Sequence, residues 1–336
     1  MRALGSALYA MKLIIQIPCY NEESTLPLTL SQLPREVPGV DKVEWLIIDD
    51  GSTDATREVA RAHGVDHVVG FTKNQGLARA FVYGLDQCIR LGADIIVNTD
   101  ADNQYRAASI PSIVSPILEG RADIVVGARP IGSIEHFSPL KKRLQRLGSW
   151  VVRQASQTDI PDAPSGFRAL SREAALKLNV FNEYTYTLET IIQAGKKNMA
   201  ICSVPVEING DLRPSRLVKS IPAYIKKSMA TIVRILVVYS PFRFFMALSV
   251  VLFGLGLVLG VRYLYFMMTG GGAGHIQSVI LAGLLLTIGF QTALIAFIAD
   301  LQAVNRKLLE DIQYRIRKLD SERSAAGPAS TNSDDK

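Results

Sequence analysis

Short apolar runs alternate with longer amphipathic stretches from Lys12 onward. The apolar runs are too short for helices and are bounded by turn residues, which is typical of strands. The expected strands are Leu13–Ile17, Val43–Ile48, His67–Val69, Ile95–Val97 and Ile124–Val126. The expected helices between them lie near Thr25–Leu33, Ala55–Ala62, Leu77–Leu91 and Ser109–Leu118. This alternation predicts an α/β fold in which helices cover both faces of a mostly parallel sheet.

Farther along, the pattern becomes more helical. Leu140–Gln154 is basic and amphipathic, and another helix is expected near Thr187–Ala194. We therefore place one globular domain at residues 12–210, preceded by an N-terminal extension at residues 1–11.

Two later stretches, Phe244–Val261 and Val279–Ile298, contain no acidic or basic residue. Each approaches the roughly 20 residues with which a helix crosses a bilayer. The alternative is a pair of buried helices in a soluble domain, but such helices normally keep a charged face. The sequence predicts a transmembrane hairpin within residues 241–301, with spans at about 244–266 and 278–299, in a multi-pass protein of the cell membrane.

The excess positive charge of the chain lies in one stretch. The whole sequence has 37 basic and 31 acidic residues, whereas the stretch from Leu212 to Ala299 has eight basic residues and no acidic one. A basic cluster ahead of a membrane span indicates attraction to anionic lipid headgroups, not to nucleic acid. Residues 211–240 are expected to form amphipathic juxtamembrane helices along the membrane surface.

The distribution of basic residues also predicts the orientation of the hairpin. The loop Thr269–Gln277 has no Lys or Arg, whereas both outer flanks of the hairpin are basic. By the positive-inside rule, the flanks and the large N-terminal domain lie in the cytoplasm. Residues 302–336 are expected to form a cytoplasmic basic helix and, beyond Leu319, a disordered tail.

The cysteines and one glycine motif add two further indications. Cys19, Cys88 and Cys202 are widely spaced and form no CxxC motif, which indicates neither a disulfide framework nor a zinc site and fits a reducing cytoplasm. Gly256 and Gly260 form a GxxxG motif in the first span. That motif predicts helix packing within one chain or between chains, so a homo-oligomer through the transmembrane helices is left open.

Polar residues follow three of the expected strands at the point where each strand ends. The first runs into Pro18–Glu23, the second into Asp49–Asp54 and the fourth into Asp100-Ala101-Asp102. The carboxyl ends of parallel strands meet at one edge of a sheet, where α/β proteins bind ligands. Asp100 and Asp102 point the same way on an extended chain, and such a pair favours Mg²⁺ or Mn²⁺ shared with a nucleotide diphosphate. A solvated turn is the alternative for this pair taken alone.

Together these loops resemble the nucleotide-sugar-binding half of family-2 glycosyltransferases, inverting enzymes with the GT-A (nucleotide-diphospho-sugar transferase) fold. The matching segments are Ile17–Glu23, Asp49–Asp54, Asn74–Ala80 and Asp100–Gln104. Gly127–Arg129 and Ser165–Arg168 resemble the polyprenyl-phosphate branch, which is typified by dolichyl-phosphate mannose synthase. The resemblance covers about residues 12–210, and the predicted hairpin matches a sub-branch that includes bacterial undecaprenyl-phosphate glucosyltransferases.

The resemblance implies a nucleotide-sugar site made by Pro18, Tyr20, Glu22, Asp49, Asp50, Gly76, Asp100, Ala101 and Asp102. Asp49 or Asp50 would accept a hydrogen bond from the base, with turn formation as the alternative for Asp49 and helix capping expected for Asp54. Gly76 would permit close backbone approach to the phosphates. The metal ligands would be Asp100, Asp102 and Gln104.

The same resemblance implies a site for the acceptor phosphate, with Arg129, Arg143, Arg146, Ser149 and Arg168 as candidates. Arg129 and Arg168 stand in family motifs and are expected to be catalytic, whereas a solvated basic face is the alternative for the other three. Asp162 is expected to be catalytic as well, either as general base or as a residue that orients another group.

The expected reaction is inverting sugar transfer from GDP-mannose or a UDP-linked hexose or N-acetylhexosamine to undecaprenyl or dolichyl phosphate. One alternative is a membrane glycosyltransferase acting on a glycolipid or polysaccharide. Processive synthases of the family carry a Gln-x-x-Arg-Trp motif, and Gln145 and Trp150 do not have that spacing. A second alternative is a non-catalytic, membrane-anchored nucleotide-sugar sensor.

Overall fold

The computed structural model describes residues 10–130, 150, 152–153, 156–180, 186–209, 230, 233–234, 237–270 and 272–326. These residues fall into two compact units. One comprises the residues up to Lys226 together with those from Ile312 onward, and the other runs from Lys227 to Asp311. The predictions for the N-terminal extension, the juxtamembrane helices between residues 210 and 229, and the last ten residues lie outside the described part of the chain, as do those for Arg143, Arg146 and Ser149.

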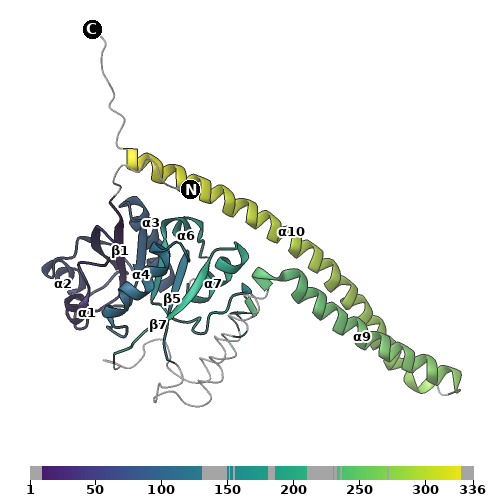
Figure 1. The fold of residues 1–336 in the computed structure, drawn as a ribbon. Coiled ribbons are helices and arrows are strands. Elements are labelled where there is room, and N and C mark those ends of the chain that lie inside the picture. The colour runs from purple at the N-terminus through teal and green to yellow at the C-terminus, as the bar shows by residue number, and fades with distance from the viewer. Residues whose placement is uncertain are drawn as a thin grey trace, which may run out of the picture. The chain divides into compact units, whose positions relative to one another are not determined.

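The first unit is built on a seven-stranded sheet with the order β3-β2-β1-β4-β6-β5-β7 (Figure 1). The strands are β1 (Lys12–Cys19), β2 (Lys42–Asp49), β3 (His67–Gly70), β4 (Ile95–Asn98), β5 (Ile124–Ala128), β6 (Arg168–Ser171) and β7 (Ile201–Pro205). Neighbouring strands are parallel except at β6, which is antiparallel to both β4 and β5. The predicted α/β class with a mostly parallel sheet is confirmed, and all five expected strands are present.

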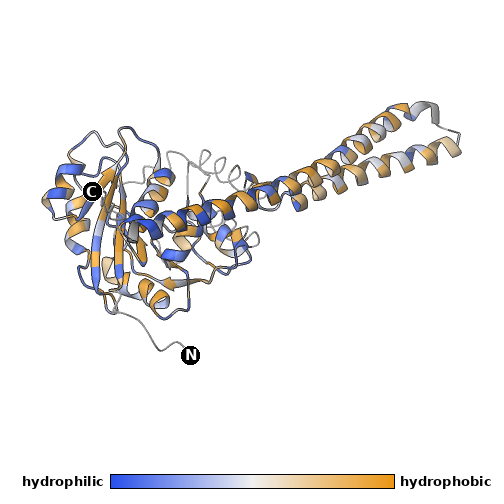
Figure 2. Ribbon diagram, turned by 90° about the horizontal axis from the view of Figure 1, so that it is seen from above, coloured by the Kyte–Doolittle hydropathy of each residue, from blue (hydrophilic) through white to orange (hydrophobic). Residues whose placement is uncertain are grey.

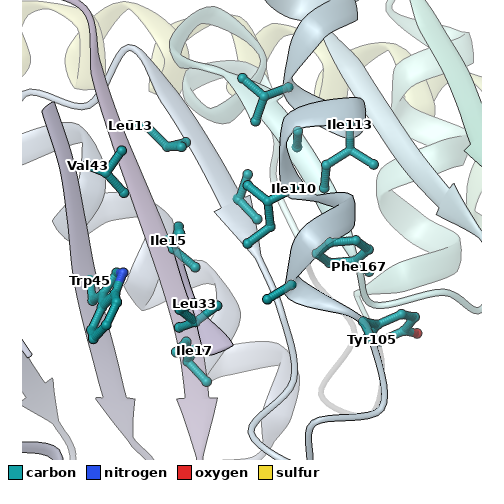
Figure 3. Packing of buried hydrophobic residues seen from close by; sticks show 14 of the residues in the cluster. Leu13, Ile15, Ile17, Leu33, Val43, Trp45, Tyr105, Ile110, Ile113 and Phe167 are labelled. Atoms are coloured by element: carbon teal, nitrogen blue, oxygen red, sulfur yellow. The ribbon is translucent and has the colours of Figure 1, made fainter. Parts of the chain in front are cut away.

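Alternate residues of the central strands enter two separate cores, one on each face of the sheet. Leu13, Ile15 and Ile17 of β1 pack with the helices α1 and α4, and Figure 3 shows them on the same face as Ile110 and Ile113. The helices of this face are α1 (Leu26–Gln32), α2 (Thr56–Ala62), η1 (Ala107–Ser109) and α4 (Ile110–Leu118). Because both faces of the strands are covered, the strands are apolar throughout instead of alternating.

The opposite face is covered by α3 (Leu77–Arg90), α6 (Arg172–Lys177) and α7 (Thr187–Lys196). Ile14 of β1 and Ile48 of β2 pack here against Phe81 and Leu85 of α3. The ring of Phe81 stacks on Tyr186 with a centroid separation of 3.8 Å. This second core therefore reaches from the middle of the sheet to the residue that precedes α7.

Two long helices, α9 (Pro241–Met268) and α10 (Ile276–Ala326), follow, with the short η3 (Gly272–His275) between them. Both are long and apolar enough to cross a membrane, and Figure 2 shows α9 and the adjoining length of α10 as mainly hydrophobic. The Ser249 hydroxyl donates to the carbonyl of Gly289 at 2.7 Å. A Cβ at Gly256 would lie 3.0 Å from Leu286, whereas one at Gly260 would meet no described atom within 4 Å. Gly256 thus packs within the hairpin, and pairing between chains stays a prediction.

The last part of α10 belongs to the first unit and contacts α6 and α3. The Tyr314 hydroxyl donates to Glu173 at 2.8 Å. The Arg317 guanidinium donates to the carbonyl of Leu178 at 2.9 Å and lies 3.6 Å from Asp86. The expected disorder beyond Leu319 is wrong as far as Ala326, because the helix continues to that residue.

Replacing Arg317 by alanine is expected to lower the free energy of unfolding of the first unit by about 1–3 kcal/mol. The substitution leaves the carbonyl of Leu178 without its side-chain donor and Asp86 without its cation. Thermal unfolding of the purified full chain measures the loss. The matched control is Arg323→Ala, which removes an exposed arginine from the same helix. Equal unfolding temperatures for the two variants would show that the contacts of Arg317 do not stabilise the unit.

Candidate active site

The loops that follow β1, β2 and β4 lie at one edge of the sheet, as predicted. Cys19 at the end of β1 pairs with Asp49 at the end of β2, and Gln16 pairs with Asn98 at the end of β4. The N–H of Asp50 donates to the carbonyl of Cys19 at 2.8 Å. The carboxyl ends of three neighbouring strands therefore deliver their acidic loops to the same place.

Asp50 organises the loop that leads into α3. Its Oδ1 accepts the N–H of Gln75 at 2.7 Å, and its Oδ2 accepts the N–H of Gly76 at 2.9 Å and the side-chain amide of Asn74 at 3.0 Å. Gly76 has a φ of 94°, which glycine adopts without strain. Because the Gly76 N–H already binds Asp50, its approach to phosphates and the contact of Asp50 with a base stay predictions.

Asp49 and Asp54 shape the second loop itself. Asp49 is fully buried and accepts hydrogen bonds from the N–H of Ser52 and the Nε of Arg57. Asp54 accepts the N–H of Thr56, where α2 begins, at 3.1 Å. The turn role expected for Asp49 is present, and its contact with a base remains a prediction. The N-cap residue of α2 is Ala55 without a side-chain cap, so Asp54 contacts the start of the helix but is not its cap. Sequence reasoning missed Arg57, the partner of Asp49.

The first loop places three predicted nucleotide-binding residues along the same edge. Pro18 lies within β1, Tyr20 is 41% exposed and Glu22 is 6% exposed. The Glu22 carboxylate accepts the hydroxyl of Thr25 at 2.6 Å. The nucleotide contacts of all three residues stay predictions.

The turn after β4 carries the predicted metal ligands. Asp102 Oδ1 accepts the N–H of Gln104 at 3.1 Å, and the carbonyl of Ala101 accepts the hydroxyl of Thr29 at 2.8 Å. The carbonyl of Gln104 in turn accepts the N–H of Asn209 at 2.9 Å. These bonds fix the backbone of the turn, while metal ligation by the Gln104 side chain stays a prediction.

The charges around Asp100 show which groups meet at the site. Burial, together with the negative charges of Asp102 and Glu22, raises the pKa of Asp100 to about 7, against the opposing effect of Arg129 and Arg168. Two loops that lie far apart in the sequence thus act on one carboxylate. The structure brings the predicted acidic pair together with Arg129 and Arg168.

A divalent cation fits the chemistry of this site. Asp100 and Asp102 are hard oxygen donors, and burial disfavours the ionised form of Asp100, which a bound cation would compensate. Among the described residues no group of three or more His, Cys, Asp or Glu side chains is arranged to hold a metal by itself. Two carboxylates suit an ion that completes its coordination with substrate phosphates, as Mg²⁺ commonly does.

Mn²⁺ binding to the purified chain is expected to tighten as the pH rises from about 5.5 to 7 and to level off above that range. Asp100 has a pKa of about 7 in the folded protein against an ordinary value of 3.8, so protons compete with the metal in this window. Without metal, the same shift makes the fold less stable as the pH rises from 3.8 to about 7. Titration of Mn²⁺ at several pH values tests this, with Asp100→Asn as control. A pH-independent affinity of the unaltered chain would contradict the assignment of Asp100.

Asp162 and Arg129 form a buried pair beside Asp100. The Arg129 Nε donates to Asp162 Oδ2 at 2.7 Å and its Nη2 donates to Oδ1 at 3.0 Å. The backbone N–H of Arg129 also donates to Oδ2, at 3.2 Å. Asp162 is wholly buried, while 12% of the Arg129 side chain is exposed. Of the two, only Arg129 reaches the surface of the site.

Arg168 is a buried residue at the start of β6. Its side chain is 0% exposed, because β6 lies inside the sheet between β4 and β5. It donates to the carbonyls of Ser165 and Ala163 at 2.8 and 2.9 Å and to the hydroxyl of Thr190. Burial lowers the pKa of Arg168 to about 10. These contacts brace the loop before β6. The catalytic role of Arg168 and its contact with an acceptor phosphate stay predictions.

Tyr105 and Asn98 support the site but lie outside the short sequence segments that resemble the family. The Tyr105 hydroxyl accepts the N–H of Gly166 at 3.2 Å, and Asn98 donates to the Gly166 carbonyl at 2.9 Å. A Cβ at Gly166 would lie 3.1 Å from the Asp100 carboxylate oxygens, so glycine allows the close approach of the two loops. Asn98 was detectable as a polar residue that ends an apolar strand, whereas Tyr105 offered no comparable signal.

Comparison with solved structures identifies the class of fold. Glucosyl-3-phosphoglycerate synthase from Mycobacterium tuberculosis, solved with Mn²⁺, uridine diphosphate and glucosyl-3-phosphoglycerate, matches with a TM-score of 0.53. The match covers 68% of this chain and 79% of that chain at 20% identity. The chain therefore has a GT-A-like α/β fold, which confirms the predicted fold class.

The sequence comparisons identify the family. Residues 14–178 match the profile described as Glycosyl transferase family 2. An undecaprenyl-phosphate mannosyltransferase from Micrococcus luteus is 28% identical over 206 residues, 58% of this chain and 83% of the relative. A UDP-N-acetylglucosamine–dolichyl-phosphate N-acetylglucosaminyltransferase from Methanococcus voltae is 30% identical over 216 residues, 57% of this chain and 83% of the relative. The chain belongs to glycosyltransferase family 2, and its distant homologues are polyprenyl-phosphate glycosyltransferases.

Proposed function

We propose that this protein transfers a sugar from a nucleoside-diphosphate sugar to a polyprenyl phosphate, undecaprenyl or dolichyl, at the cytoplasmic face of a membrane. One observation carries the proposal: the charges of Arg129 and Asp102 both act on the carboxylate of Asp100. An anion-binding side chain therefore lies beside the carboxylate pair that suits a metal-bound diphosphate. Donor and acceptor phosphates would thus have adjacent sites. GDP-mannose and UDP-linked hexoses or N-acetylhexosamines are the candidate donors.

The donor half of the proposal rests on the turn after β4. Asp100 and Asp102 would hold Mg²⁺ or Mn²⁺, which supplies charge neutralisation for the departing nucleoside diphosphate. The loops after β1 and β2 line the same edge and would bind the nucleotide, with Tyr20 as the exposed ring. Asp50 keeps the loop before α3 in place through three hydrogen bonds.

The chemical step needs positioning more than proton transfer. A phosphate oxygen of the lipid forms a bond to the anomeric carbon, and the bond between that carbon and the diphosphate oxygen breaks. The departing nucleoside diphosphate takes the electron pair, and attack from the opposite side inverts the anomeric centre. A phosphate monoester has a second pKa of about 6, so the nucleophile is already anionic near neutral pH. Alignment and electrostatic stabilisation supply most of the rate.

The lipid acceptor is supported by the second unit and by the relatives. Helices α9 and α10 have the length and apolar composition of membrane spans, which suits a multi-pass protein of the cell membrane. The relatives from Micrococcus luteus and Methanococcus voltae are named for transfer to undecaprenyl and dolichyl phosphate. A hairpin in the bilayer would keep a family-2 domain beside lipids that carry a phosphate headgroup.

The test combines a panel of donors with two acceptors. Membranes that contain the protein are incubated with radiolabelled nucleotide sugars and either undecaprenyl or dolichyl phosphate, and control membranes lack the protein. We expect one donor to give a labelled, acid-labile lipid that is absent from the control. Label found only in a polysaccharide or in a glycolipid without the added phosphate would support the alternative acceptors and contradict the proposal. Donor binding without transfer would indicate a sensor.

A further inference from the structure

We infer that Asp162 is a positioning residue, a carboxylate anchor that aims Arg129 at the acceptor phosphate, and that it is not the general base of the transfer. This inference rests on the proposed function, because it assigns roles around the acceptor of that reaction. The sequence leaves two roles open for Asp162, general base or a residue that orients another group, and the inference chooses the second.

The hydrogen bonds of Asp162 tie its carboxylate to Arg129. Both of its oxygens are occupied by one residue, since the Nε, Nη2 and backbone N–H groups of Arg129 all donate to it within 3.2 Å. Its side chain is wholly buried. A general base must reach the proton that it removes. Asp162 could do so only after losing a bidentate, charge-assisted pair, which belongs to the strongest class of hydrogen bond in proteins.

Arg129 keeps one side of its guanidinium that Asp162 does not bind. Its Nη1 group makes no hydrogen bond to any residue that the structure describes, and part of the side chain is exposed. Burial lowers the pKa of Arg129, but Tyr105, Asp162 and Asp100 outweigh this effect and leave the pKa raised. The guanidinium therefore stays charged, with one edge held by Asp162 and another edge directed away from it. A planar fork held in this way suits phosphate oxygens.

The loop that carries Asp162 is held independently of Arg129. The N–H of Ser165 donates to the carbonyl of Asp162 at 3.2 Å, and the Ser165 hydroxyl donates to the carbonyl of Gly127 at 2.6 Å. The buried Arg168 binds the carbonyls of Ala163 and Ser165. The loop around Asp162 is thus held by contacts that do not involve the Arg129 side chain. Arg168 acts one step farther away, as the brace of this loop.

The two roles of Asp162 predict opposite effects on the affinity for a lipid phosphate when its charge is removed. If Asp162 were a base beside the acceptor, removing its charge would leave phosphate binding unchanged or strengthen it, because two anions repel. If Asp162 holds Arg129, the same substitution releases the guanidinium and weakens phosphate binding. The two readings therefore predict opposite changes in the affinity for a lipid phosphate.

The first experiment measures this affinity without any donor. The full chain is placed in phosphatidylcholine nanodiscs and titrated with undecaprenyl phosphate. We expect Asp162→Asn and Arg129→Ala each to weaken binding about tenfold or more, and the double variant to be no weaker than Arg129→Ala alone. The control is Asp159→Asn, which removes the same charge from an exposed carboxylate that lies 3.3 Å from Arg153. Unchanged or tighter binding by a folded Asp162→Asn variant overturns the inference.

The second experiment covers the case in which Asp162→Asn fails to fold. Arg129→Lys keeps the positive charge but removes the fork, and Mn²⁺ binding reports whether the site is intact. We expect a loss of lipid-phosphate affinity of about tenfold with normal Mn²⁺ affinity. An Arg129→Lys variant that binds undecaprenyl phosphate as tightly as the unaltered chain overturns the inference, since a bidentate anchor would then be dispensable.

Transfer kinetics separate this inference from the proposed function. For Asp162→Asn we expect the KM for undecaprenyl phosphate to rise about tenfold or more, with kcat within about threefold and an unchanged pH profile. A loss of kcat of more than about a hundredfold at unchanged KM would identify a base and overturn the inference. If the unaltered chain transfers no sugar from any donor, the proposed function fails, while the binding series still decides the role of Asp162.

Discussion

Replacing Asp102 by alanine is expected to abolish sugar transfer and to leave the fold intact. Asp102 is partly exposed in a turn, where its Oδ1 accepts one backbone hydrogen bond, from Gln104. The loss of that bond costs about 1 kcal/mol. The loss of one of two metal-binding carboxylates is expected to lower kcat/KM at least about a thousandfold, equivalent to about 4 kcal/mol of transition-state stabilisation. Label transfer to lipid phosphate and thermal unfolding measure the two effects separately.

The matched control for this experiment is Asp54→Ala. Asp54 lies at the same edge of the sheet and also accepts backbone N–H groups, from Glu23 and Thr56, but it follows β2 and not β4. We expect Asp54→Ala to lose stability and to keep most of its activity. If the two variants lost activity to the same extent, the special role of Asp102 would be wrong and a general loosening of the edge would explain both.

Replacing Gly51 by alanine has the largest expected effect on stability. Gly51 has a φ of 72°, and a Cβ there would lie 2.4 Å from the carbonyl carbon of Lys73. Backbone atoms cannot move aside as a flexible side chain does, so the two loops must separate. Strain at a left-handed position costs about 1–3 kcal/mol, and the clash adds to it. We expect a loss of about 3 kcal/mol or more, measured by denaturant unfolding, together with weaker binding of nucleotide because Asp50 no longer holds its loop.

Gly92→Ala is the control that isolates the clash. Gly92 has a φ of 81°, but a Cβ there would meet no described atom within 4 Å. This variant carries only the backbone strain and is expected to lose about 1 kcal/mol and no nucleotide affinity. Equal losses for the two glycines would show that the close approach of the loops at Gly51 is unimportant.

The central strands were predictable because their environment is uniform. Each of β1, β2 and β4 is covered by helices on both faces, so its residues are apolar almost without interruption and stand out in the sequence. The acidic loops were predictable for a related reason. The carboxyl ends of neighbouring parallel strands lie at the same edge of the sheet, whatever residues the loops contain.

The strand β6 was not predictable from local pattern. It has four residues, Arg-Ala-Leu-Ser, and its first is an arginine that is fully buried. Its strand conformation comes from antiparallel pairing with β4 and β5, which lie far away in the sequence. The burial of Arg168 and its contacts with the loop before β6 were therefore not predictable either, because they depend on this strand.

The contacts that support the site were not predictable, although Gly166 stands in the matching segment Ser165–Arg168 and Asn98 ends an apolar strand. Tyr105, Asn98 and Gly166 act on one another across three segments of the chain, and none of them stands in an acidic pair or a basic cluster. The sequence indicated which charged groups meet, namely Asp100, Asp102 and Arg129. Only the structure shows that Arg129 donates hydrogen bonds to Asp162 and that Asp100 lies against the loop containing Gly166.

The most direct test of the account is phosphorus NMR of one reaction mixture. The purified chain is incubated with Mg²⁺, which is diamagnetic, and with undecaprenyl phosphate and the donor that labels lipid in the panel. We predict that the phosphomonoester signal of the lipid is replaced by a phosphodiester signal while one equivalent of nucleoside diphosphate appears. Release of nucleoside diphosphate with an unchanged phosphomonoester signal would contradict the account, because the sugar would then have gone to water or to another acceptor.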